Sequence, residues 1–143
     1  MPAPSLLRRH RFAVALVAWT FVVWTTRIAN IWRDEGLDTG GKVVRTALAL
    51  SFTVLALAVV AALWRARRLT VPAVAALAAW TVAVWVVRGA GLVAGDHEVG
   101  FKVVHTVLAV VSIGLAVLAW RETRGAVPVP AGRDRVVAGR RDP

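Results

Sequence analysis

Four long apolar segments most constrain what this sequence of 143 residues can fold into. They cover residues 12–32, 43–64, 71–93 and 103–120, and an α-helix needs roughly 20 residues to cross a lipid bilayer. A soluble domain is usually about 45–50% apolar, whereas this chain is 58% hydrophobic. Because only short loops and two tails remain, we predict an all-α, polytopic membrane protein with four transmembrane helices and no separate soluble domain.

The second half of the chain repeats the first. Residues 16–29 read LVAWTFVVWTTRIA and residues 77–90 read LAAWTVAVWVVRGA, at an offset of 61. GKVVRTALA at residues 41–49 matches FKVVHTVLA at residues 101–109, at an offset of 60. Chance similarity between Val/Ala-rich helices does not readily explain tryptophans, an arginine and a lysine in register. We therefore predict a tandem duplication of a two-helix unit.

The duplication sets the expected organisation of the chain. A unit that crosses the membrane twice returns to the side where it began, so both repeats should face the same way, unlike inverted-repeat transporters. The last helix of the second repeat is expected to be about one turn shorter than its counterpart. The predicted segments are a cytoplasmic N-terminus (1–11), a first transmembrane hairpin repeat (12–68), a second hairpin repeat (69–124) and a disordered basic C-terminal tail (125–143).

Charge is distributed unequally between the two ends of the predicted helices. One end carries twelve arginines and three acidic residues, and the other carries six basic and five acidic residues. The positive-inside rule places the first end, with both termini, in the cytoplasm and the hairpin loops at 33–41 and 94–100 outside. Scarce lysine beside abundant arginine fits a GC-rich bacterial genome, so we expect a multi-pass protein of the bacterial inner (cytoplasmic) membrane. Basic residues that flank apolar spans argue against a nucleic-acid partner.

Basic residues also lie just inside the outer ends of the predicted spans. Arg27 and Arg88 lie about five residues, or roughly 7 Å, below the outer interface. Each follows a tryptophan by three residues, which would allow a cation–π contact within its own helix. The only two lysines mark the start of each return helix. The candidate site for an anionic lipid or headgroup comprises Trp24, Arg27, Lys42, Arg45, Trp85, Arg88, Lys102 and His105.

Two interpretations of this basic cluster remain open. The cations could extend toward the interface and pair with the acidic residues of the outer loops, which would only fix the loops. Alternatively, they could bind an anionic group such as a lipid phosphate or a quinone-type headgroup, because the guanidinium fork suits phosphate.

The sequence contains few of the residue patterns that are typical of enzyme active sites. The chain has no cysteine, and we find no nucleophile–base pair, phosphate loop or metal-ligand spacing, so we expect no enzyme activity, cofactor or metal. The spans contain no Asp or Glu, which disfavours a proton-coupled transporter. We expect an accessory or structural protein that binds lipid or partner helices. The alternative is a small transporter or channel acting as an oligomer. Membrane lipids are the expected partners, and other membrane proteins or a second copy of the chain stay open.

The repeated unit has a Trp-rich first helix, a short acidic loop and a second helix ending in Trp-Arg. In the first copy these parts read AWTFVVWTTRIANIWRDEGL, GGKVVRTALALSF and LWR. The unit resembles a group of small, uncharacterised actinobacterial two-helix integral membrane proteins, and the resemblance covers residues 18–65 and again 79–121. It implies that this chain is a tandem fusion of two such units, and it implies no activity.

Overall fold

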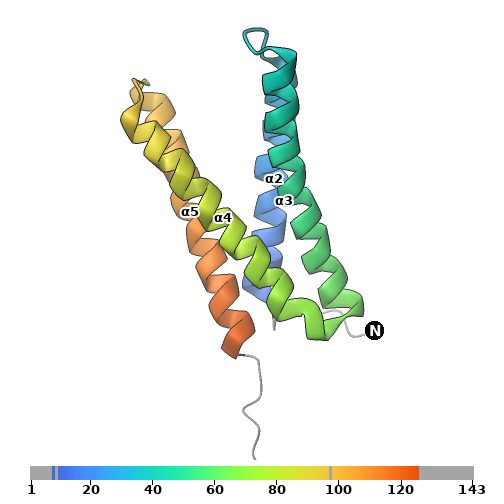
Figure 1. Cartoon of the computed structure of the whole chain (residues 1–143). Coiled ribbons are helices and arrows are strands. Elements are labelled where there is room, and N and C mark those ends of the chain that lie inside the picture. The colour runs from blue at the N-terminus through green and yellow to red at the C-terminus, as the bar shows by residue number, and fades with distance from the viewer. Residues whose placement is uncertain (1–7, 9, 97, 126–143) are drawn as a thin grey trace, which may run out of the picture.

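The computed structural model describes residues 8, 10–96 and 98–125 (Figure 1). Its long helices are α2 (Arg11–Arg33), α3 (Thr39–Arg65), α4 (Thr70–Ala94) and α5 (Val99–Gly125), and a short 3₁₀ helix, η1 (Arg67–Leu69), joins α3 to α4. All four α-helices are long and apolar enough to cross a membrane. The predicted all-α fold with four candidate transmembrane helices is therefore confirmed, and it indicates a multi-pass membrane protein. The predicted C-terminal tail beyond residue 125 and most of the predicted N-terminal segment lie outside the described residues.

The helices extend beyond the apolar segments. α3 begins at Thr39, and the carboxylate of Asp38 caps it by accepting the backbone N–H of Gly41 at 3.2 Å. α5 continues through Glu122 and Thr123 to Gly125, and Thr123 is buried. Both α3 and α5 have 27 residues, so the expectation of a shorter last helix is wrong. Polar residues carry α5 past the apolar segment because Glu122 and Thr123 make contacts inside the bundle.

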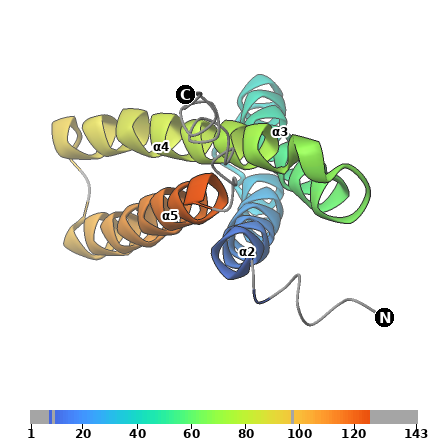
Figure 2. The ribbon, with the colours of Figure 1, turned by 90° about the horizontal axis from the view of Figure 1, so that it is seen from below.

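The chain forms two antiparallel helical hairpins, α2–α3 and α4–α5, which pack against each other through α2 on α5 and α3 on α4. The α2–α3 and α4–α5 connections lie at one end, here called the loop end (Figure 1). The start of α2, η1 and the end of α5 lie at the opposite end, here called the linker end. The hairpins are close together at the linker end and diverge toward the loop end (Figures 1 and 2).

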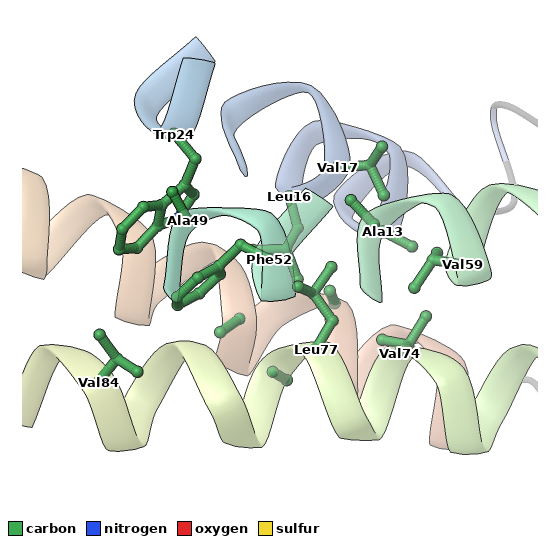
Figure 3. Packing of buried hydrophobic residues seen from close by; sticks show 14 residues of the cluster. Ala13, Leu16, Val17, Trp24, Ala49, Phe52, Val59, Val74, Leu77 and Val84 are labelled. Carbon is green, nitrogen blue, oxygen red and sulfur yellow. The ribbon is translucent and has the colours of Figure 1, made fainter. Parts of the chain in front are cut away.

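A narrow apolar core holds the hairpins together (Figure 3). Phe52 of α3 is its largest fully buried side chain, and the Trp24 ring stacks on it with centroids 4.0 Å apart. Leu16 of α2 and Leu77 of α4 are also fully buried. The outward faces are apolar as well, with exposed residues such as Val54. Apolar residues on both sides of each helix suit a bundle whose outer surface meets lipid.

Matching residues of the two hairpins have matching environments. The hydroxyl groups of Thr20 and Thr81 are buried, and each donates to the carbonyl four residues earlier, at 2.7 and 2.8 Å. Two further hydrogen bonds join the hairpins, from Trp19 Nε1 to Ser112 Oγ and from Trp80 Nε1 to Ser51 Oγ, both at 2.9 Å. The two tryptophans are separated by 61 residues, the offset between the first helices. The two serines are also 61 residues apart, although the second helices align at an offset of 60, so the serines lie one position out of register.

Candidate anion site between the hairpins

Each hairpin contains a buried tryptophan in its first helix. Trp24 of α2 is 4% exposed and Trp85 of α4 is 6% exposed. Each lies about one helical turn beyond the buried threonine of its helix, on the side of the loop end. Arg27 and Arg88 follow the tryptophans by three residues, so the arginines lie on the same helix faces, closer to the loop end.

The cation–π contact at this position crosses between the hairpins. The guanidinium carbon of Arg88 lies 5.8 Å from the centre of the Trp24 ring. This arrangement differs from the expected contact between an arginine and the tryptophan of its own helix. Packing of the two hairpins brings α4 to the Trp24 ring, and sequence spacing within one helix cannot encode that approach.

Arg27 has an unsatisfied donor in this region. Its Nε atom is buried and has no hydrogen-bond partner. The positive charges of Arg27, Arg45 and Arg88 are close enough to repel one another, and the negative charge of Asp34 partly offsets this repulsion at Arg27. Within the described part of the chain, no ion pair joins these arginines to a carboxylate of the loop end. Among the described residues, the loop acids thus form no ion pair with Arg27, Arg45 or Arg88, although Asp34 acts on Arg27 at longer range.

A cavity of about 590 Å³ adjoins the two arginines. Arg27 reaches it from one hairpin, and Arg88 and His105 reach it from the other. Trp85 and several apolar residues of α4 and α5 complete its wall. A second cavity of about 330 Å³ is bordered by the same three basic side chains and by Trp24. Cavities of this size and mixed lining are typical of small-molecule sites.

His105 is held by its own helix. Its Nδ1 lies 2.9 Å from the carbonyl oxygen of Phe101, and the ring centroids of His105 and Phe101 are 3.9 Å apart. A carbonyl oxygen only accepts hydrogen bonds, so Nδ1 carries the proton in this contact. Nε2 is then the nitrogen left for a ligand.

The other predicted site residues lie away from the cavity wall. Arg45 is exposed on α3, while Lys42 and Lys102 are half-buried in the first turns of α3 and α5. None of the three lines either cavity. The structure thus brings together Trp24, Arg27, Trp85, Arg88 and His105, and leaves the lysines and Arg45 at the periphery.

Some residues of the site were not predicted as such. Gly89 and Gly91 line the larger cavity, and the sequence signal is that they replace Ile28 and Asn30 of the first repeat. Thr106 also lines it and donates to the Lys102 carbonyl at 2.8 Å. Residues such as Gly, Thr and Val form no recognisable ligand-binding motif in the sequence. Their place in the cavity wall therefore becomes visible only from the packing of the helices.

Across residues 8, 10–96 and 98–125, no group of three or more His, Asp or Glu side chains could hold a metal ion. Comparison of the chain with protein-family models, with curated proteins and with solved structures gives no match. The resemblance to small actinobacterial membrane proteins therefore stays a prediction, and the function has to be argued from the site itself.

Proposed function

We propose that this chain is a non-enzymatic accessory or structural protein of a bacterial inner membrane, which binds an anionic lipid headgroup between its two hairpins. The hairpins are tandem repeats that face the same way. Their loop end lies outside and both termini lie in the cytoplasm.

The observation that carries this proposal is the convergence of Arg27 and Arg88 on one cavity, where neither forms an ion pair with a carboxylate of the described residues. Arginine inside an apolar span is costly, and such residues usually face a polar partner or a functional site. An anionic oxygen group would satisfy the free Nε of Arg27 and offset the repulsion between the two guanidinium groups. The planar fork of donors on each arginine suits phosphate in particular.

The arrangement as two same-facing repeats is supported by the contacts between the hairpins. The bond from Trp19 to Ser112 and the bond from Trp80 to Ser51 join equivalent tryptophans to serines that lie one position out of register in the alignment of the second helices. The two sets of helix contacts between hairpins, α2 with α5 and α3 with α4, exchange when one repeat is mapped onto the other. A twofold axis along the membrane normal would produce this pattern.

The test is to purify the chain from its native membrane and to identify the bound lipids by mass spectrometry. The wild type should carry an anionic lipid, and the double variant Arg27→Leu/Arg88→Leu should lose it while remaining folded. Arg33→Leu is the matched control, because Arg33 is an exposed arginine of α2 that does not line the cavity. A wild type that carries no anionic lipid would contradict the proposal.

A further inference from the structure

The two repeats differ at the wall of the larger cavity. The first repeat has Ile28 and Asn30 where the second has Gly89 and Gly91, at the offset of 61. Both glycines line the cavity, and a Cβ atom added at either one would meet no other atom within 4 Å. Glycine weakens the interior of a helix, and nothing packs closely enough here to require it. The missing side chains leave room beside Arg88.

The rest of the cavity wall is amphiphilic. Arg27, Arg88 and His105 supply the polar part, and residues such as Leu92 and Ile113 supply the apolar part. Val110 also borders the cavity and is 66% exposed. The cavity therefore continues onto the outer surface of α5, the surface that would meet lipid.

We propose that the cavity holds one phospholipid with a net negative charge, taken from the bilayer leaflet at the loop end. Its phosphate lies between Arg27 and Arg88, and one acyl chain passes over Gly89 toward Ile113. This inference rests on the proposed function. It goes beyond it by naming the class of ligand and the part of the cavity wall along which the acyl chain lies. The binding site belongs to the second repeat because only that repeat has glycine at both positions.

A soluble anion fits this cavity less well. Inorganic phosphate would occupy only a small part of about 590 Å³ and would leave an apolar wall facing water. A lipid covers that wall with its acyl chain while its phosphate contacts the arginines. The burial of apolar surface then adds to the binding free energy of the ionic contact. Both ligands share the same phosphate chemistry, so the experiment has to separate them.

The test uses the full chain reconstituted in phosphatidylcholine vesicles that contain a minor fraction of phosphatidylglycerol. After extraction in mild detergent, native mass spectrometry counts the phosphatidylglycerol that stays bound. Gly89→Ile fills the cavity with the side chain of the matching position, Ile28, and keeps every charge. Gly89→Ala is the matched control, since one methyl group leaves most of the space.

We expect the wild type and Gly89→Ala to retain phosphatidylglycerol, and excess inorganic phosphate to displace none of it. Gly89→Ile should lower retention by about tenfold, the factor that corresponds to losing one moderate contact. Arg27→Leu/Arg88→Leu should lower it at least as far. Circular dichroism and gel filtration check that each variant is folded, and Gly91→Leu replaces Gly89→Ile if the latter is not.

The outcomes separate this inference from the proposed function. Wild-type retention by a folded Gly89→Ile, together with loss in the arginine variant, would overturn the glycine-lined lipid site and leave headgroup binding standing. Full displacement by inorganic phosphate would show a soluble-anion site and overturn the inference. Undiminished retention in both variants would contradict the inference and the proposed function together.

Discussion

The indole Nε1 of Trp19 donates a hydrogen bond of 2.9 Å to the hydroxyl of Ser112, a residue 93 positions later on the last helix. This bond links α2 to α5 through two side chains inside the apolar zone. Its counterpart between Trp80 and Ser51 links α4 to α3 at the same distance. The two bonds join the hairpins on the linker side of Trp24 and Trp85, so they hold the part of the interface from which the anion site opens.

Replacing either serine by alanine should weaken the contact between the hairpins. The indole N–H then loses its acceptor, and interhelical hydrogen bonds in membranes contribute about 0.6 kcal/mol on average and at most about 1.7. Ser112→Ala and Ser51→Ala should therefore each lower the free energy of unfolding in detergent by about that amount. Ser112→Ala should have the larger effect because Ser112 is buried whereas Trp80, the partner of Ser51, is partly exposed. Equal stability of Ser112→Ala and the wild type would show that the bond does not join the hairpins.

Phe52 is expected to be the most sensitive position of the core. It is fully buried and stacks on Trp24, so Phe52→Ala should lower the free energy of unfolding by about 3–5 kcal/mol. Val54→Ala is the control on the same helix, because Val54 is 64% exposed, and its cost should stay within about 0.5 kcal/mol. Equal effects of the two substitutions would contradict the core as described.

Glu122 of α5 caps the start of α2. Its Oε2 accepts the backbone N–H groups of Phe12 and Ala13 at 3.0 and 3.3 Å, where a carboxylate also suits the positive end of the α2 dipole. Glu122→Ala should cost about 1 kcal/mol of unfolding free energy, as the loss of an N-terminal cap does. Glu122→Gln should cost less because its amide oxygen still accepts. Glu35→Ala, in the exposed α2–α3 loop, serves as the control, and an equal effect there would exclude a capping role for Glu122.

Because Gly41 has no side chain, the Asp38 carboxylate can lie close to its backbone and cap the start of α3. A Cβ atom at Gly41 would lie 2.8 Å from the Oδ1 of Asp38 and 3.2 Å from the Cγ of Leu37, so Gly41→Ala must displace the capping carboxylate. Gly100→Ala in α5 meets no neighbour within 4 Å and should stabilise by about 0.5–1 kcal/mol, as expected for Gly to Ala in a helix. Gly41→Ala should lack this gain because the lost cap offsets it. A similar gain in the two variants, measured by thermal unfolding, would contradict this account.

The sequence predicted the fold more fully than the site. Four apolar segments of spanning length predict four helices because length and hydropathy are local properties. Hydropathy does not predict the start of α3 or the end of α5. There Asp38, Glu122 and Thr123 extend the helices through polar contacts, which a hydropathy profile does not include. The sequence identifies Arg27, Arg88 and His105 as basic residues inside apolar segments, and the structure brings them to one cavity.

The contacts between the hairpins could not be predicted in the same way. The partner of Arg88 is Trp24 of the other hairpin, because the angle between the hairpins decides which ring the guanidinium reaches. The larger cavity lies against α4 and α5, where Gly89 and Gly91 leave space, and Arg27 reaches it from α2. Arg45 and the two lysines were assigned to the cluster by their depth along the helices, but depth does not fix the direction in which a side chain lies.

The central claim is that two same-facing transmembrane hairpins gather Arg27 and Arg88 near the external face of the inner membrane. Cysteine labelling in intact cells tests this claim most directly. The chain has no cysteine, so single substitutions Gly36→Cys, Asp96→Cys and Arg68→Cys can each be tested with a membrane-impermeant maleimide. We predict that the cysteines at positions 36 and 96 react from outside and that the cysteine at position 68 reacts only after the membrane is opened. Reaction of only one of the two loop positions, or of position 68 in sealed cells, would contradict the account.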